Sequence, residues 1–432
     1  MIWNEAKECM SRDEMTHLQS TRLSKLVNRI YHNVEYYRKK MQNLGLEPGD
    51  IKGIEDITKL PFTTKDDLRD TYPFGLFAVP QSEIVRIHAS SGTTGKPTVV
   101  GYTQHDIEIW AECVARVFAM GNVGRNDTVQ VSYGYGMFTG GLGAHYGAEY
   151  IGATTVPLST GNTKKQLSMM KDFGVTTICC TPSYLMYLTE AIEEQGILND
   201  IKLRAAFCGA EPWTENMRRE LESRLHITAH DIYGLSEILG PGVAGDCTFH
   251  SGLHVHEDHF LPEIISPDTL QPVADGETGE LVFTTLTKEG IPLLRYRTKD
   301  LTSITREKCE CGRTTARLSK FKGRSDDMLI IRGVNVFPSQ VEAALLEIGE
   351  VSPNYLLIVD RVGNLDTLEV LVEVDEKFFS DEIKELERLT KRITQVLQQA
   401  LLIAPTVKLV EPKTIQRSEG KAVRVIDKRK LV

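Results

Sequence analysis

The most informative stretch of the sequence is HASSGTTGKPT, residues 88–98. It follows Ile84–Ile87, which alternates like a strand, and it combines hydroxyl side chains and glycines with one lysine. Backbone amides, hydroxyls and an ammonium group are the donors that hold a phosphate chain. The composition indicates a phosphate-binding loop formed by Ser90, Ser91, Gly92, Thr93, Thr94, Gly95 and Lys96.

This loop differs from the P-loop of the common NTPases. Only two residues separate Gly92 from Gly95, and Pro97 after Lys96 prevents the helix start which that motif requires. Taken alone, the stretch is equally typical of an ordinary turn between two strands. The choice depends on the motifs that follow it.

The rest of the chain predicts a layered α/β fold. Apolar positions at helical spacing, and a capping box at Thr64 and Asp67, indicate a helical prelude over residues 1–75. Short apolar strands then alternate with longer helical patterns from Glu83 to about Ile232. This alternation is typical of a parallel sheet, whose ligands collect at the carboxyl ends of the strands.

The predicted secondary structure changes after about residue 240. Residues 240 to 320 read as a β-rich subdomain, with strands expected over 276–284 and 292–297. Beyond a boundary near 326, strands and a long helix at about 381–402 indicate a smaller α+β unit. We therefore predict a large N-terminal domain over 1–326, with layered parallel sheets, and a mobile C-terminal domain over 327–432.

Composition limits the partners. Among 432 residues, 59 are acidic and 50 are basic, which gives a net charge of -9. This balance argues against a nucleic-acid or membrane binder. The N-terminus lacks a signal-peptide pattern, and no apolar run reaches about 18 residues, so a cytoplasmic protein is expected.

Two turns after predicted strands carry further polar groups, Cys208–Pro212 and Asp231–Glu237. A carboxylate, Asp300, lies on a later predicted strand, and Lys421 lies on a glycine turn near the C-terminus. Each feature alone is more typical of a solvated loop than of a site. Both turns nevertheless fall where a parallel sheet places its ligands.

In this order the motifs resemble the adenylate-forming superfamily of acyl-CoA synthetases, luciferases and adenylation domains. Within it, the chain is most similar to phenylacetate-CoA ligases. The resemblance covers nearly the whole chain and rests on 90–97, 133–141, 231–237, 295–297 and 323–338. It implies an ATP-dependent aryl-acid CoA ligase that forms an acyl-adenylate, releases pyrophosphate and then AMP, and uses Mg²⁺.

The resemblance also implies roles for individual residues. Ser90 to Lys96 would hold the β- and γ-phosphates, Glu237 would bind Mg²⁺, Asp300 would accept from the ribose hydroxyls, and Tyr233 would stack on adenine. Arg324 would reach the ribose or phosphates. The remaining nucleotide-binding positions are Gly209, Ala210, Glu211, Pro212, Asp231, Gly234 and Ser236.

Three further roles belong to the C-terminal domain by the same resemblance. Lys421 would neutralise the carboxylate and α-phosphate during adenylation. Asp326 matches the hinge at which that domain rotates before thioester formation. The CoA tunnel would be faced by Gly333, Val334 and Asn335.

An aryl-acid pocket is expected around Tyr133, Tyr135, Phe138, Gly140 and Gly141. Aromatic walls with small residues suit a flat ring, but such a cluster after a buried strand is equally typical of core.

Cys309 and Cys311, with Cys247 and His254, make a four-ligand set that suits structural Zn²⁺. His250, His256 and His259 compete with His254, and free thiols are the alternative. The other cysteines lie in apolar or helical settings that suit buried thiols.

Other functions stay open at this point. The same core could pass its acyl group to a carrier protein, transfer AMP to a deazaflavin, or serve as a non-catalytic nucleotide sensor. Retention of Glu237, Asp300, Arg324 and Lys421 argues against a sensor. A homodimer is expected.

Overall fold

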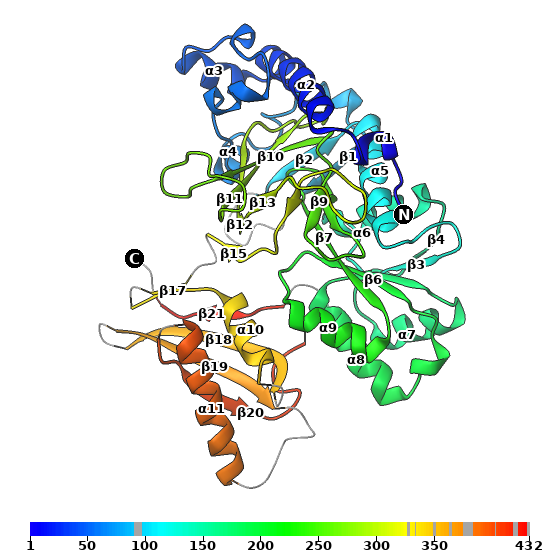
Figure 1. Ribbon diagram of the computed structural model, residues 1–432, viewed down its shortest axis with the longest axis vertical. Helices are drawn as coiled ribbons and strands as arrows, with labels where there is room; N and C mark the ends of the chain where they lie inside the picture. Colours follow the sequence, from blue (N-terminus) through cyan, green and yellow to red (C-terminus); the bar gives the residue numbers. More distant parts are fainter. Residues whose placement is uncertain are drawn as a thin grey trace. The chain divides into compact units, whose positions relative to one another are not determined.

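The computed structural model describes residues 1–89, 97–325, 329–332, 334–348, 351–362, 365–374, 383–401, 403–417 and 422–429. Two compact units are present (Figure 1). The first comprises 1–180, 197–210 and 228–321, and the second comprises 181–196, 211–227 and 322–432. The second unit thus includes two segments from inside the predicted N-terminal domain, and the division at 326 stays a prediction.

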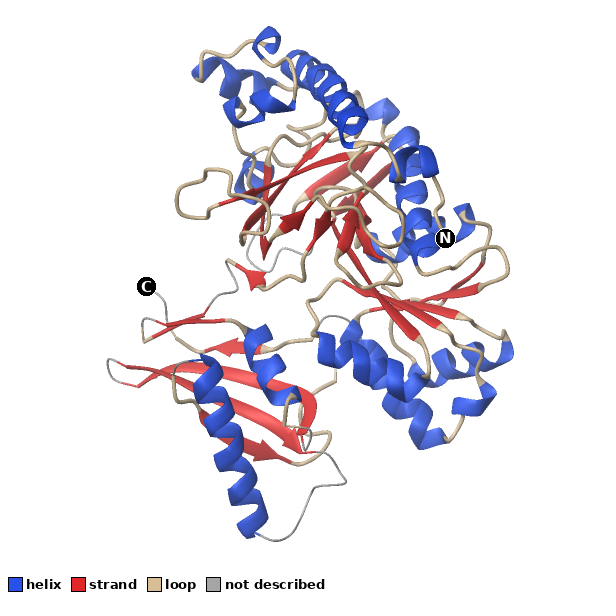
Figure 2. Cartoon of the chain, viewed as in Figure 1, coloured by secondary structure: helices blue, strands red, loops and turns tan. Residues whose placement is uncertain are grey.

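A mixed sheet forms the centre of the first unit, and strands are drawn in red in Figure 2. Its strand order is β13-β14-β9-β8-β7-β6-β5-β3-β4. Strands β4, β3, β5, β6 and β7 pair in parallel, which confirms the predicted parallel sheet, and the others pair antiparallel. The strands are β3 (Thr128–Val131), β4 (Thr154–Pro157), β5 (Thr177–Cys180), β6 (Ala205–Gly209), β7 (Thr228–Leu235), β8 (Gly240–Asp246), β9 (Leu253–Val255), β13 (Ile304–Thr305) and β14 (Arg317–Leu318).

Helix α5 (Gln104–Met120) shows how the sequence builds the core. It begins at a capping box of Thr103 and Asp106, and almost all of its later residues are buried. Its neighbour α6 (Thr139–Tyr150) approaches closely because a Cβ at Gly147 would lie 2.3 Å from a Val114 methyl carbon. The third helix of this region is α7 (Thr163–Asp172).

The predicted β-rich region is an antiparallel arrangement of β10 (Phe260–Ile265), β11 (Gly279–Thr285) and β12 (Tyr296–Thr302). The strand expected over 292–297 was placed wrongly, because β12 begins only at Tyr296. Arg295 has φ 40, a left-handed conformation that interrupts extended backbone. A separate antiparallel pair, β1 (Arg86–Ala89) and β2 (Val99–Tyr102), flanks residues 90–96 in the sequence.

The prelude is helical, as predicted, and packs its apolar face into the core of the first unit. Its elements are α1 (Glu5–Glu8), α2 (Arg12–Asn33), α3 (Glu35–Asn43), α4 (Lys65–Asp70) and the 3-10 turns η1 (Pro48–Asp50) and η2 (Ile54–Lys59). Thr63 fixes it to β12, since its amide donates to Arg295 O at 3.1 Å and its carbonyl accepts from Arg297 N at 2.9 Å. Further 3-10 turns are η3 (Gln81–Glu83) and η4 (Leu198–Asp200).

The second unit has its own sheet, in the order β20-β19-β18-β21, and its own apolar core. Helices α8 (Pro182–Gln195) and α9 (Glu215–Leu225) belong to it. The Glu211 carboxylate joins these parts, accepting from Ser183 N at 2.7 Å and Ala422 N at 2.9 Å. The other elements are β15 (Gly323–Arg324), β16 (Leu329–Ile331), β17 (Val334–Val336), α10 (Pro338–Leu346), β18 (Val351–Val362), β19 (Leu365–Val374), α11 (Ile383–Leu401), β20 (Thr406–Val410) and β21 (Val425–Asp427).

Among the described residues, no helix combines the length and the apolar character that a bilayer crossing requires.

Candidate functional site

Glu237 lies just beyond β7 and is almost fully buried. Lys65 places its ammonium nitrogen 3.5 Å from Glu237 Oε1, although the Lys65 side chain is 42% exposed and that of Glu237 only 7%. Lys65 is the first residue of α4, whose capping box at Thr64 and Asp67 is present as predicted. A lysine from the prelude therefore reaches the predicted magnesium ligand.

A second cation, Lys288, supports the backbone at the same point. Its ammonium donates to Glu237 O at 3.2 Å and lies 4.7 Å from the centroid of the Tyr102 ring. Burial lowers the pKa of Lys288 to about 8, while Asp106 and Glu237 act in the opposite direction. Removing an ammonium from water disfavours its charged form, which explains the direction.

Asp300 and Tyr233 are linked directly. The Tyr233 hydroxyl donates to Asp300 Oδ2 at 2.6 Å, and the Asp300 amide donates to Thr298 Oγ1 at 3.0 Å. The ring of Phe321 stacks on that of Tyr233, with centroids 4.4 Å apart. The two residues predicted to hold ribose and adenine are thus neighbours.

Two predicted nucleotide positions require glycine for steric reasons. A Cβ at Gly209 would lie 2.1 Å from Ile232 O, and one at Gly234 would lie 1.8 Å from Gly240 O. Ala210 follows in a left-handed conformation, with φ 72. Ser236 Oγ is 2.9 Å from Thr139 Oγ1, which ties the loop after β7 to the start of α6.

Asp231 is on β7, in the first unit. The other predicted nucleotide and CoA positions divide into two groups. Glu211, Pro212 and Arg324 belong to the second unit, together with Val334 at the start of β17 and Asn335, whose side chain is not described. Outside the described residues lie Ser90, Ser91, Gly92, Thr93, Thr94, Gly95, Lys96, Asp326, Gly333 and Lys421.

The residues predicted to line the aryl pocket differ in how tightly they are packed. Tyr133 is buried, and its hydroxyl donates to Phe207 O at 3.5 Å, whereas Phe138 is 39% exposed. A Cβ at Gly140 would meet the Phe138 ring at 2.3 Å, and one at Gly141 would meet Gly134 O at 2.6 Å. Both glycines therefore serve the packing of α6, and their contact with a ligand stays a prediction.

The loop before α6 offers more space. A Cβ at Gly134 or at Gly136 would have no neighbouring heavy atom within 4 Å. Tyr135 lies between them, with its hydroxyl 3.3 Å from His145 Nδ1. Gly134 and Gly136, on either side of a polar aromatic side chain, therefore suit the wall of a pocket better than the tightly packed Gly140 and Gly141 do.

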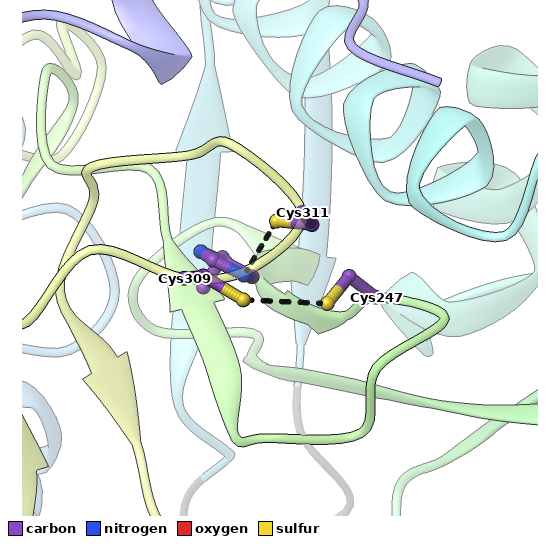
Figure 3. A group of neighbouring side chains, drawn as sticks. Cys247, Cys309 and Cys311 are labelled. Carbon is purple, nitrogen blue, oxygen red and sulfur yellow. Dashed lines mark hydrogen bonds between the residues drawn. The ribbon is translucent and has the colours of Figure 1, made fainter.

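The thiol cluster consists of Cys247, His254, Cys309 and Cys311, whose candidate ligand atoms all lie within 4.8 Å of one another. Figure 3 shows its three cysteines. Cys247 Sγ is 3.9 Å from Cys309 Sγ, and Cys311 Sγ is 3.4 Å from His254 Nε2. In a tetrahedral zinc site, bonds of about 2.3 Å to sulfur and about 2.1 Å to nitrogen give edges of roughly 3.8 and 3.6 Å. The donor set and both distances therefore fit zinc.

The surroundings of the thiol cluster also suit a cation. Hydrogen bonding to His254 lowers the pKa of Cys309 to about 7. The hydrogen bond between Cys247 and Cys311 lowers the pKa of Cys311 and raises that of Cys247. His254 Nδ1 lies 3.0 Å from Thr315 Oγ1, a contact that leaves Nε2 directed at the thiols. A cavity of about 510 Å³ borders Cys247 and Cys311.

Two lysines were absent from the sequence-based prediction, Lys65 and Lys288. Lys65 has a recognisable local signal, because a capping box fixes its position at a helix start. Lys288 has none, because only the fold buries it beside Glu237.

Comparisons with known proteins agree with this architecture. The AMP-binding enzyme family matches residues 47–286, more than half of the chain, and the AMP-binding enzyme C-terminal domain family matches 333–429. The chain belongs to the AMP-binding enzyme family. This confirms the predicted adenylate-forming superfamily.

Individual relatives are more specific. A phenylacetate-coenzyme A ligase of Thermus thermophilus is 48% identical, with all of both chains covered. Its counterpart in Escherichia coli is 50% identical over 98% of this chain and 97% of its own. The predicted similarity to phenylacetate-CoA ligases is confirmed.

The fold class has independent support. A crystal structure of 2-hydroxyisobutyryl-CoA ligase, bound to 2-HIB-AMP in the postadenylation state, has a TM-score of 0.93 and 27% sequence identity. The match covers 98% of this chain and 92% of the other. The predicted α/β fold with a smaller C-terminal part is therefore confirmed.

Proposed function

We propose that this chain is an ATP-dependent, AMP-forming phenylacetate-CoA ligase. The observation that carries the proposal is the identity of 48–50%, over 98–100% of the chain, to proteins of that name. The first unit adds a buried carboxylate beside two lysines and a linked Tyr233–Asp300 pair, which suit a charged nucleotide.

The first half-reaction joins two anions. An oxygen of the aryl carboxylate attacks the α-phosphorus of ATP, the bond to the β-phosphate breaks, and pyrophosphate leaves. Negative charge accumulates on the phosphoryl oxygens, so cations and donors fixed at that point lower the barrier. Lys65 is a described cation that can contribute there, with Lys96 and Lys421 expected to add to it.

Glu237 would supply a protein carboxylate to Mg²⁺, which prefers oxygen ligands and shares its shell with phosphates and water. When bound, the ion neutralises phosphate charge. Asp300 would accept from the ribose hydroxyls while Tyr233 orients its carboxylate. Tyr135, with Gly134 and Gly136, would face the aryl group.

The second half-reaction uses CoA. Its thiolate attacks the carbonyl carbon of the acyl-adenylate, the acyl–phosphate bond breaks, and AMP leaves with the bonding electrons. Gly333, Val334 and Asn335 would border the CoA chain, and Asp326 would be the hinge. These assignments are part of the proposal.

The first test is pyrophosphate exchange into ATP with Mg²⁺, using phenylacetate, hydroxylated phenylacetates, benzoate, indoleacetate and a medium-chain fatty acid. We expect the strongest exchange with arylacetates and AMP release on addition of CoA. Exchange without CoA turnover would favour a carrier-protein or deazaflavin acceptor. No exchange with any acid would contradict the ligase assignment and favour a sensor.

Lys421→Ala provides a sharper test within the same assay. We expect adenylation to fall by roughly 10²-fold or more, because one charge-stabilising donor is lost. Thioester formation from presynthesised phenylacetyl-adenylate should persist. Unimpaired exchange in this variant would exclude Lys421 from the adenylation step.

The thiol cluster is proposed to hold structural Zn²⁺, which would fix the β9–β14 region without taking part in the reaction. Protein purified without added metal should contain at least about one zinc per chain, and less than about 0.2 would contradict the proposal. A cytoplasmic homodimer also stays a prediction, and light scattering of the purified protein tests its oligomeric part.

A further inference from the structure

A second group of metal-ligating side chains lies near the thiol cluster but is separate from it. His230 is on β7, Asp246 is the last residue of β8, and His250 lies in the turn that follows. Candidate ligand atoms of the three all lie within 4.8 Å of one another. His230 and Asp246 are buried, and the His250 side chain is 18% exposed.

One turn supplies ligands to both groups. His250 N donates to Cys247 O at 3.0 Å, which closes a turn directly after β8. Asp246 ends β8 and Cys247 follows it directly. The two side chains enter different groups, since Asp246 joins His230 and His250, while Cys247 joins His254 and the other two thiols.

Packing holds His230 at this position. Its ring stacks between Phe207, with centroids 5.1 Å apart, and His250, with centroids 5.4 Å apart. A Cβ at Gly121 would lie 2.8 Å from His230 Nε2, so glycine leaves room for the edge of the imidazole. A structural Asp–His pair requires only Asp246 and His250, whereas the second imidazole makes the group suitable for an ion.

The chemistry of these donors restricts the ion. Two imidazoles and one carboxylate suit Zn²⁺, Fe²⁺, Co²⁺ or Ni²⁺, whereas Mg²⁺ and Ca²⁺ prefer oxygen ligands throughout. Asp246 Oδ2 lies 2.5 Å from His250 Nδ1, and such carboxylate contacts orient an imidazole for metal binding. Nitrogen and oxygen ligands at about 2.1 Å are roughly 3 to 4 Å apart. The candidate ligand atoms lie within 4.8 Å of one another, with one pair at 2.5 Å, so only modest adjustments are required.

We propose that His230, Asp246 and His250 bind a divalent transition-metal ion at a second centre, separate from the thiol cluster. His250 is the outer ligand and the entry point, because its side chain is the one partly exposed. The bound ion ties β7 to the β8–β9 turn. Because β7 also carries Tyr233, the ion fixes the strand that leads into the nucleotide site.

The test uses cobalt titration of the full-length, metal-free protein, followed by metal analysis after dialysis. Cys309→Ser/Cys311→Ser removes two thiolate donors and should still retain one Co²⁺ per chain, with weak visible bands and without the intense sulfur-to-cobalt absorption. Adding His250→Ala should abolish this remaining cobalt. His17→Ala, an exposed histidine on α2, is the matched control and should retain it.

A second variant covers the case in which loss of the thiols prevents folding. His250→Ala in the otherwise intact protein should bind one cobalt fewer than the parent while keeping the sulfur-to-cobalt absorption. Equal metal content in His250→Ala and the parent would overturn the proposal. A folded Cys309→Ser/Cys311→Ser variant that binds no cobalt would also overturn it.

Discussion

The thiol cluster and the two carboxylates of the proposed nucleotide site, Glu237 and Asp300, differ in how their polar groups are paired. In the thiol cluster, donor distances of 3.9 and 3.4 Å are close to the edges of a zinc tetrahedron. At the proposed nucleotide site, each carboxylate has a protein partner, Lys65 for Glu237 and Tyr233 for Asp300. We expect the thiol cluster to bind its ion with little rearrangement, and the carboxylates to exchange partners when a nucleotide binds.

The difference follows from the type of group. In the thiol cluster the sulfur atoms and the imidazole contact one another at distances that a metal ion could bridge. A buried carboxylate is costly unless it is paired, so the fold provides a cation for Glu237 and a hydroxyl for Asp300. Exchange of such a partner is expected to be part of substrate binding.

Among the variants that test this difference, Glu237→Gln should have the largest effect on activity. The amide has nearly the same shape but loses the charge that would bind Mg²⁺, so pyrophosphate exchange should fall by roughly 10²-fold or more. Glu277→Gln, at an exposed carboxylate just before β11, is the control. Full exchange activity in Glu237→Gln would show that another group holds the ion.

Loss of the thiol cluster should act on stability and leave the chemistry nearly unchanged. In Cys309→Ser/Cys311→Ser, we expect the free energy of unfolding to fall by roughly 2 kcal/mol or more, because a structural metal is lost. In the presence of a chelator, the parent and the variant should unfold at the same denaturant concentration. Cys9→Ser, outside the cluster, should retain the response to chelator, and a parent that ignores chelation would contradict the prediction.

Lys65→Gln should reduce pyrophosphate exchange by about tenfold or more, because a cation beside the phosphate site is removed. Lys65→Arg should recover much of the activity, since it keeps the charge. Thioester formation from added acyl-adenylate should change little. Lys39→Gln, an exposed lysine of the same prelude, is the control, and an equal loss in both variants would indicate a general charge effect.

The smallest expected effect concerns Lys288 and pH. Burial lowers the pKa of Lys288 to about 8, from 10.5. Between these values the unfolded chain binds more protons than the folded chain, so this group makes stability rise with pH. Relative to Lys288→Met, the parent should gain about 1 kcal/mol in unfolding free energy between pH 7.5 and 9. Denaturant unfolding at both pH values measures this difference. An equal change in unfolding free energy in the two proteins would contradict the lowered pKa.

Much of the fold was predictable from local patterns. The capping boxes at Thr64 and Thr103 mark helix starts. Between Thr128 and Ile232, strands alternate with helices along the chain, which is the pattern of a parallel sheet. Beyond Glu237 local patterns were less reliable. The left-handed backbone at Arg295 delays β12, and side-chain periodicity does not record this conformation.

The sequence by itself determined the family, the order of the motifs and the residue types that the chemistry requires, because each depends on short stretches read in order. The tertiary structure alone decided which histidine joins the thiols. His254 does so, while His250 faces Asp246, His256 contacts Cys113 O and His259 contacts Thr287. It also brought Lys65 and Lys288 to Glu237. Contacts between residues far apart in the chain depend on how strands and helices pack, and spacing along the sequence does not contain that information.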